Sequence, residues 1–267
     1  MQTPDLSPDH GPVLSVVIPT RNEAANAPAL VSQLAAVLGP ISSEVIFVDD
    51  SDDGTPAALE AAAVDAGLQL SVVHREGAER KGGLSTAVLA GIREAGGAYV
   101  LIMDADLQHP TDLITPLLRR AEETDADIVI ASRFVPGGSD KGLAGTQRRV
   151  ISWGAKTLVK TLFLRTLRGV TDPLSGFFLA RRELLMDATL RPIGFKILLD
   201  ILIRCGHSRV EELPLVFAAR AGGDSKATLS QGKDFLTHVL TLFRDVRFDG
   251  QLRRVRNLRS HGRSRSG

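Results

Sequence analysis

The sequence predicts an α/β fold in which a doubly wound, mostly parallel sheet carries helices on both of its faces. Short apolar runs rich in β-branched residues alternate with longer segments rich in Ala, Leu and charged residues, which is the pattern of repeated strand–helix–strand units. The short runs are apolar throughout, as expected of strands that are covered on both faces. Each interval is long enough for a helix that joins two parallel strands.

The elements expected in the first half of the chain follow this alternation in order. The strands are Val13–Ile18, Glu44–Val48, Leu70–His74, Tyr99–Met103 and Ile128–Ala131. The helices between them are Glu23–Leu38, Pro56–Ala66, Leu84–Ala95 and Pro110–Glu122.

The second half predicts a C-terminal extension of the same domain. Its expected elements are an amphipathic stretch over Arg148–Arg168, a short apolar run over Phe177–Ala180, a helix over Phe195–Cys205, a strand over Glu211–Phe217, a loop over Arg220–Ser230 and a last amphipathic helix over Lys233–Phe248. We expect a disordered lead-in over residues 1–12, a single catalytic domain over 13–249 and a flexible basic tail over 250–267.

Composition excludes several classes of protein. The chain has 267 residues, of which 43% are hydrophobic, too many for an intrinsically disordered chain. A single cysteine, Cys205, excludes a disulfide framework and a multi-cysteine zinc site. Neither a signal peptide nor an 18-residue apolar segment is visible. These features predict a cytoplasmic protein.

Charge is divided unequally along the chain. Residues 1–140 carry 8 Lys and Arg against 21 Asp and Glu, a net charge of −13, whereas residues 141–267 carry 24 against 10, a net charge of +14. Acidic clusters bind metal ions, and basic faces bind phosphates, nucleic acid or anionic lipid. The division suggests two separate binding tasks, with uneven surface charge as the plainer explanation.

The polar residues that follow the expected strands are the best candidates for a functional site, because ligands bind at the carboxyl ends of the strands in such sheets. No two glycines are separated by a single residue, which excludes the dinucleotide-binding G-x-G-x-x-G, and residues 81–86 (KGGLST) do not follow the P-loop order. The strand ends instead carry PTRNE at 19–23, DDSDDGT at 49–55 and DADLQ at 104–108.

Asp104 and Asp106 are the strongest chemical signal. Two carboxylates one residue apart repel each other unless a cation neutralises them. Hard oxygen ligands suit Mg²⁺ or Mn²⁺, and Gln108 adds a neutral oxygen. The acidic loop at 49–53 has two interpretations: Asp53 and Thr55 are typical of a turn before a helix, whereas Asp49 or Asp50 could accept hydrogen bonds from a nucleobase or ribose.

Seven motifs in order resemble those of a known enzyme family. They are residues 19–23 (PTRNE), 48–55 (VDDSDDGT), 103–110 (MDADLQHP), 131–134 (ASRF), 175–177 (SGF), 194–199 (GFKILL) and 220–226 (RAGGDSK). Over about residues 13–245 the chain resembles the family-2 glycosyltransferases of the GT-A fold, and within them the dolichol-phosphate (polyprenol-phosphate) mannosyltransferases. The family usually has Tyr at the position of Arg21, although a guanidinium group can also stack on a base.

The resemblance implies a role for each matching residue. The donor's guanosine would be surrounded by Pro19, Arg21, Glu23, Phe47, Asp49 and Asp50. A Mg²⁺ or Mn²⁺ ion, the diphosphate and the sugar would be held by Asp104, Ala105, Asp106 and Gln108, with the metal on Asp104, Asp106 and Gln108. The donor's anionic groups would also contact Arg133, Arg220 and Lys226. The acceptor phosphate would be bound by Arg133, Arg148 and Ser152, and the catalytic residues would be Asp104, Asp106 and Arg133.

The reaction implied is the inverting transfer of mannose from GDP-mannose to a dolichyl or polyprenyl phosphate. Such an acceptor carries about −1.5 to −2 charges near neutral pH, so it needs cationic positioning rather than a general base. Asp172 either orients the arginines or caps a turn. Because the acceptor lies in a bilayer, we expect the protein to bind the cytoplasmic face of a membrane peripherally, through its two C-terminal amphipathic stretches and basic tail. Trp153 is expected in the core or at that interface.

Two alternatives differ from this interpretation. The first is a family-2 transferase that uses UDP-glucose or another nucleotide sugar on polyprenyl phosphate. The second is a non-catalytic module that binds nucleotide sugars or nucleic acid through the basic half. RNA binding normally requires exposed aromatic side chains, and only 4% of the residues are aromatic, so no nucleic-acid partner is expected.

Overall fold

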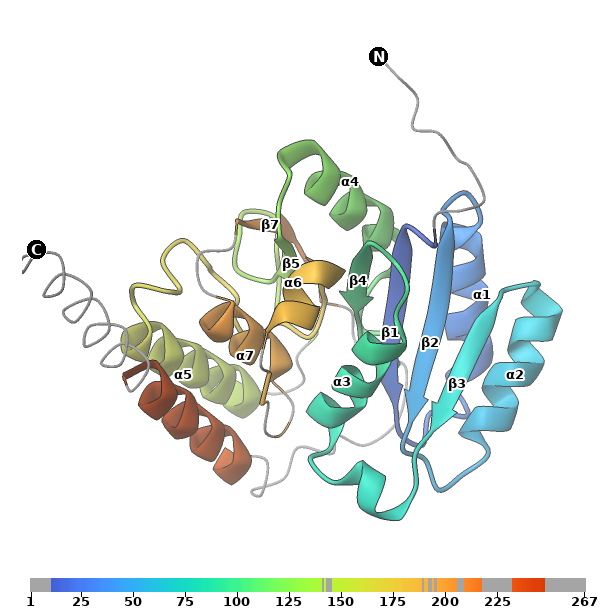
Figure 1. Cartoon of the computed structure of the whole chain (residues 1–267), viewed down its shortest axis with the longest axis horizontal. Coiled ribbons are helices and arrows are strands. Elements are labelled where there is room, and N and C mark those ends of the chain that lie inside the picture. The colour runs from blue at the N-terminus through green and yellow to red at the C-terminus, as the bar shows by residue number, and fades with distance from the viewer. Residues whose placement is uncertain are drawn as a thin grey trace, which may run out of the picture.

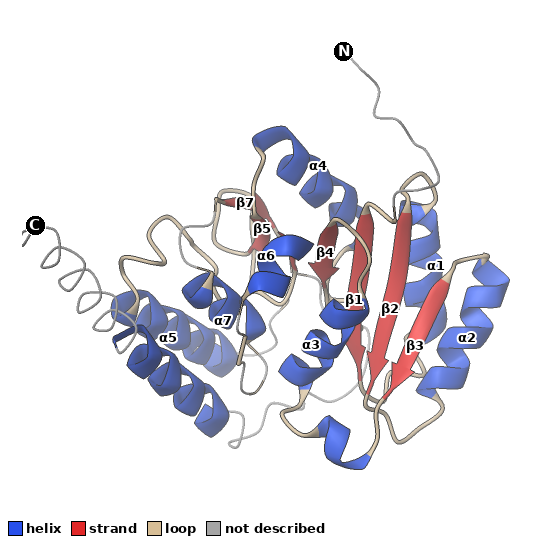
Figure 2. Cartoon of the chain, viewed as in Figure 1, coloured by secondary structure: helices blue, strands red, loops and turns tan. Residues whose placement is uncertain are grey.

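The computed structural model describes residues 11–140, 142, 146–188, 190–191, 194, 196–205, 209–217 and 232–247. Its centre is a seven-stranded sheet in the order β3-β2-β1-β4-β6-β5-β7, flanked by helices (Figures 1 and 2). The strands are β1 (Leu14–Thr20), β2 (Ser43–Asp49), β3 (Leu70–His74), β4 (Tyr99–Ile102), β5 (Ile128–Ser132), β6 (Phe178–Arg181) and β7 (Val210–Pro214). The predicted fold class is confirmed.

Strand β6 is the exception to parallel pairing. It runs antiparallel to both of its neighbours, β4 and β5, while every other pair is parallel. Ile102 of β4 and Ile130 of β5 both pair with Phe178 at the start of β6. The end of β4, the start of β6 and the end of β5 therefore meet at one edge of the sheet.

The helices cover both faces. They are α1 (Ala27–Leu38), α2 (Thr55–Ala66), α3 (Leu84–Glu94), α4 (Ile114–Thr124), α5 (Thr146–Leu162), α6 (Arg182–Asp187) and α7 (Ile197–Arg204). Short 3₁₀ turns span Gly77–Arg80 and Thr111–Leu113, and a further helix spans residues 232–247. Figure 1 shows that last helix beside α5, and the rings of Phe163 and Phe243 meet edge to face at 6.3 Å.

Alternate residues of each strand enter two separate hydrophobic cores, because side chains of a strand point to opposite faces. Val17 and Val48 pack with α3, α5 and α7, whereas Val16 and Phe47 pack with α1, α2 and α4. Helix α3 approaches the sheet closely at Gly91, where an added Cβ would come within 2.4 Å of Val17 Cγ1. Only glycine fits at this crossing.

Most predicted elements are confirmed, and the differences have local causes. Helix α1 begins at Ala27 rather than Glu23, because Asn22 has a left-handed φ of 55° and the Glu23 amide donates to Thr55 Oγ1 instead of a helical partner. Helix α5 ends at Leu162 rather than Arg168 and continues in turns. Helix α6 and the direction of β6 were not predicted. Most of the expected lead-in and the whole basic tail lie outside the described residues.

Candidate active site

A pocket opens at the edge where β4, β6 and β5 meet. Its volume is about 610 Å³ when the space at its solvent-open mouth is included. Its polar wall contains Asp104, His109, Arg133, Ser175 and Lys196. The pocket therefore joins a residue of the predicted metal site to the predicted catalytic arginine.

Asp104 and Asp106 lie on a tight turn that follows β4. Leu107 has a left-handed φ of 60°, and the amide of Gln108 donates to Asp106 Oδ1 at 3.2 Å. Asp104 lines the pocket, and its side chain is 39% exposed. Gly176 lies opposite: an added Cβ would come within 3.1 Å of Asp104 Oδ2. The glycine keeps space open beside that carboxylate.

His109 contacts the backbone of the turn that carries Asp104 and Asp106. Its Nδ1 accepts a hydrogen bond from the Asp104 amide at 2.9 Å. Its ring stacks on Phe177 at 5.0 Å and meets the edge of Phe217 at 5.6 Å. Burial lowers the pKa of His109 despite the nearby charges of Asp104 and Asp106. His109 is thus a buried residue of the pocket wall.

Arg133 follows β5 and is fixed by Asp172. Its Nε and Nη2 donate to the two carboxylate oxygens of Asp172 at 2.7 and 2.8 Å. Burial alone would lower the pKa of Arg133, but the hydrogen bond and charge of Asp172 outweigh it and hold the pKa above its ordinary value. Asp172 is fully buried, and its own amide donates to Glu212 at 3.0 Å. Asp172 therefore orients Arg133, the first of its two predicted roles.

Lys196 is a pocket residue to which the sequence assigned no role. Its Nζ donates to the carbonyl oxygen of Leu174 at 2.9 Å. Burial, together with the charge of Arg133, lowers the pKa of Lys196 to about 8. The only signal in the sequence is a single charge at the start of the apolar run 194–199. A cation held in this way can respond to an anionic ligand.

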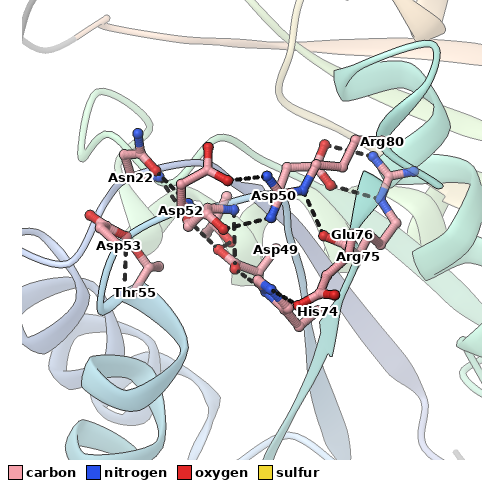
Figure 3. Close-up of polar contacts among 12 residues, drawn as sticks. Asn22, Asp49, Asp50, Asp52, Asp53, Thr55, His74, Arg75, Glu76 and Arg80 are labelled. Carbon is pink, nitrogen blue, oxygen red and sulfur yellow. Dashed lines mark hydrogen bonds and ion pairs between the residues drawn. The ribbon is translucent and has the colours of Figure 1, made fainter. Parts of the chain in front are cut away.

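The acidic loop after β2 is bound internally (Figure 3). Asp49 is fully buried. Its Oδ1 accepts hydrogen bonds from the hydroxyls of Thr20 and Ser51, and its Oδ2 lies 2.7 Å from His74 Nδ1. Both oxygens of the carboxylate are thus bonded to protein groups. Through them the end of β2 is linked to Thr20 of β1 and His74 of β3.

Asp50 and Asp52 each have an arginine partner. Asp50 accepts a bidentate pair of bonds from Arg75, at 2.8 Å from Nε and 2.6 Å from Nη2. Arg75 also donates to Thr86 Oγ1 at the start of α3. At the surface Asp52 pairs with Arg80 (Figure 3). Its hydrogen bond to Arg80 lowers the pKa of Asp52.

The remaining residues predicted to contact the donor lie at different depths. Arg21 is exposed and Glu23 is half-buried, while Pro19 is buried in β1. Phe47 is fully buried and packs in the core beneath α1 and α2. Ala105 is also buried. Asp53 accepts a bond from the Thr55 amide at 3.0 Å, which confirms its predicted place in a turn.

The predicted acceptor site is described in part. Ser152 lies on α5 and is half-buried. The backbone of Arg148 belongs to the same helix, but its side chain lies outside the described residues, as do Arg220 and Lys226. Trp153 is 62% exposed, so it is not a core residue. Cys205 ends α7, and burial raises its pKa to about 11.

The mostly parallel sheet with paired aspartates beyond β4 is consistent with one class of protein, the nucleotide-sugar transferases. Residues 15–188 match the family model described as glycosyl transferase family 2, and the chain belongs to that family. It is a glycosyltransferase.

Three relatives are named dolichol-phosphate mannosyltransferase. The protein of Pyrococcus furiosus is 37% identical over 91% of this chain, and the chain spans 66% of that relative's length. The Saccharomyces cerevisiae protein is 36% identical over 79% of this chain and 80% of its own. The Mycosarcoma maydis protein is 35% identical over 87% of this chain and 80% of its own.

Solved structures share the fold. Glucosyl-3-phosphoglycerate synthase of Mycobacterium tuberculosis, in complex with Mn²⁺, UDP-glucose and phosphoglyceric acid, superposes with a TM-score of 0.63 at 21% identity, over 87% of this chain and 80% of that one. The same enzyme with glucosyl-3-phosphoglycerate, UDP and Mn²⁺ gives 0.63 at 25% identity, over 87% and 78%.

Proposed function

We propose that this chain transfers mannose from GDP-mannose to a dolichyl or polyprenyl phosphate, with inversion at the anomeric carbon. The observation that carries the proposal is the pocket that Asp104 and Arg133 both line, with Gly176 next to Asp104. The family and the names of the three relatives, at 35–37% identity, support mannose and dolichyl phosphate as the sugar and the acceptor.

The residues at the end of β4 fit a divalent cation. Within the described part of the chain, no three His, Cys, Asp or Glu side chains gather in a metal-binding group, so Asp104 and Asp106, with Gln108, would leave most ligand positions to the donor's diphosphate. Mg²⁺ and Mn²⁺ are typically bound in this way, and Gly176 keeps the space beside Asp104 open. When bound, the cation would neutralise charge on the leaving nucleoside diphosphate.

The two cations of the pocket, Arg133 and Lys196, would have different roles. Arg133, held by Asp172, would fix the acceptor phosphate so that one oxygen faces the anomeric carbon. Lys196 would lie between the two substrates and add positive charge as the sugar–phosphate bond breaks. A phosphate monoester is already ionised, so no side chain is needed to remove a proton from it. We retain Arg148, Ser152, Arg220 and Lys226 as further phosphate ligands in this proposal.

The donor's guanosine would lie against the loops after β1 and β2. Arg21 is exposed there and can stack on a base, while Glu23 is half-buried nearby. Asp49 and Asp50 would act mainly by fixing these loops, because their oxygens are bonded to Thr20, Ser51 and Arg75.

The acceptor requires a membrane surface, and two helices provide an apolar one. None of the described helices is both long and apolar enough to cross a bilayer. Helix α5 and the turns after it expose Ile151, Trp153 and Leu164 by 62–67%. The adjacent helix 232–247 exposes Leu236 and Leu240 by 51% and 62%. These side chains would enter the lipid interface on the cytoplasmic face of a membrane.

A transfer assay tests the proposal. Purified protein is given radiolabelled GDP-mannose or UDP-glucose with polyprenyl phosphate and Mg²⁺ or Mn²⁺, and the lipid products are separated by thin-layer chromatography. We expect a mannolipid from GDP-mannose. UDP-glucose is the second candidate donor because the structural neighbour binds it. A glucolipid would identify that alternative, and no lipid product from either donor would contradict the proposal.

Membrane binding is tested separately by co-sedimentation with liposomes. Anionic vesicles should retain the protein at low salt and release it as salt rises, because the electrostatic part of the attraction is screened. Trp153→Ser should weaken binding. Protein that stays in the supernatant at low salt would contradict peripheral docking.

A further inference from the structure

Lys156 is a cation of helix α5 that the proposed reaction has not used. Its Nζ lies 3.3 Å from the centroid of the Phe134 ring. Phe134 directly follows Arg133, whose guanidinium carbon lies 5.4 Å from the same ring. The ring of Phe134 therefore makes cation–π contacts with two cations, one from the end of β5 and one from α5.

The negative charges that act on Lys156 are shared with Arg133. Among the described residues no carboxylate forms an ion pair with Lys156, and Asp172 is fully engaged by Arg133. Burial lowers the pKa of Lys156; Arg133 and Lys160 lower it further, while Asp172 and Asp140 oppose them. A cation–π contact offsets only part of the cost of such a site. An anion placed between Lys156 and Arg133 would relieve the repulsion.

The position of Lys156 separates it from the metal side of the pocket. Lys196 lines the pocket with Asp104 and Arg133, whereas Lys156 is not among its described lining residues and contacts the ring of Phe134, over which Arg133 also lies. Arg133 is thus the cation common to both sides. Lys156 also lies four residues after Ser152, so both side chains are on one face of α5.

We propose that Lys156 is a second cationic ligand of the acceptor phosphate, and that Phe134 holds it in readiness until the acceptor binds. Two N–H donors of Arg133 are already given to Asp172, so a phosphate dianion requires further donors. An ammonium group on a flexible stem can leave the ring and meet the phosphate. The ligand class is a phosphate monoester at the end of a lipid, and the inference rests on the proposed function.

The test uses a short-chain, water-soluble isoprenyl phosphate, so that membrane binding does not contribute. Steady-state kinetics are measured for the wild type, Lys156→Met, Lys156→Arg and Lys160→Met. Lys160→Met is the matched control, because it removes the same charge one turn further along α5. Binding of the isoprenyl phosphate alone, without donor, is measured by calorimetry for the same four proteins.

We expect Lys156→Met to raise both the Kd and the KM for the isoprenyl phosphate about tenfold, the effect of one charge-assisted hydrogen bond. The KM for the donor should stay within about twofold. Lys156→Arg should recover most of the affinity, and Lys160→Met should resemble the wild type. An unchanged acceptor affinity in Lys156→Met, or an equal loss of donor affinity, overturns the inference. A wild type that transfers no sugar to any lipid phosphate contradicts the proposed function itself.

Discussion

The two acidic strand ends of this sheet look alike in the sequence and differ in the structure. After β2, Asp49 and Asp50 are buried and bonded to His74 and Arg75 of the neighbouring strand end. After β4, the Asp104 side chain is 39% exposed beside a pocket. The first end is neutralised by the protein and fixes loops, whereas the second lies beside the pocket in which we propose that the donor and its cation bind. Acidic strand ends therefore differ in function according to what the adjacent strand supplies.

The largest effect, on transfer activity, is expected from a substitution at the end of β4. Asp106→Ala should lower transfer at least about a thousandfold, because the bound cation loses a charged ligand and the leaving diphosphate loses its counter-ion. The melting temperature should change little, since Asp106 is partly exposed. Asp52→Ala is the matched control, as it also removes one aspartate from a strand-end loop. Activity that persists both in Asp106→Ala and in the presence of EDTA would contradict the metal site.

Substitutions at the end of β2 should lower the stability of the protein. Arg75→Leu leaves Asp50 charged and unpaired in a buried position, at a cost of about 3–5 kcal/mol in the free energy of unfolding. Urea denaturation measures it. The double variant Asp50→Leu/Arg75→Leu should recover much of the loss, because no buried charge remains. If the double variant is as unstable as Arg75→Leu, the pair does more than neutralise charge.

A third prediction concerns Lys196, a cation of the pocket whose pKa is lowered by burial. Its pKa of about 8, below the ordinary 10.5, means that the unfolded chain binds more protons between these pH values. The stability of the wild type relative to Lys196→Met should therefore rise with pH from about 8 to 10.5, by about 3 kcal/mol at most. Denaturation of both proteins at pH 7, 9 and 10 measures it, and a constant difference would contradict the shift.

The smallest effect is expected at the surface. Asp52 pairs with Arg80, but its side chain is 63% exposed, and exposed ion pairs contribute little because water and salt screen them. Asp52→Ala should melt at the wild-type temperature, as measured by calorimetry. A clear decrease would mean that the bonds of Arg80 to the Ser51 and Arg75 carbonyls depend on this aspartate.

Much of this comparison could be predicted from the sequence, because strand ends follow from local apolar patterns. The turn at Asp104–Asp106 depends on the strand next to it in the chain, whereas a role for Arg133 was expected only from the resemblance to the family, and its partner Asp172 is 39 residues away. Arg75 could not be assigned to Asp50, since the two are 25 residues apart and meet only through the pairing of β2 with β3. The signal was a basic pair, His74 and Arg75, at the end of the adjacent expected strand.

The sequence did not predict the direction of β6 or the place of Lys196 in the pocket, for a different reason. An apolar run such as residues 177–180 has the same pattern in either direction, so its antiparallel place between β4 and β5 cannot be inferred from composition. Lys196 faces the pocket only because β6 and α7 bring separate segments together there. Sequence patterns therefore miss the residues whose position depends on the order of the strands in the sheet.

The antiparallel strand also acts as a spacer. Ile102 and Ile130 share the partner Phe178, so these two residues, which precede Asp104 and Arg133, lie level with each other, two strand spacings or about 10 Å apart. This separation is set by backbone hydrogen bonds and not by the loops above it. Loops and helices can change which sugar or lipid is admitted, but in the proposed reaction the interval across which a sugar would pass from one phosphate to the other is set by the sheet.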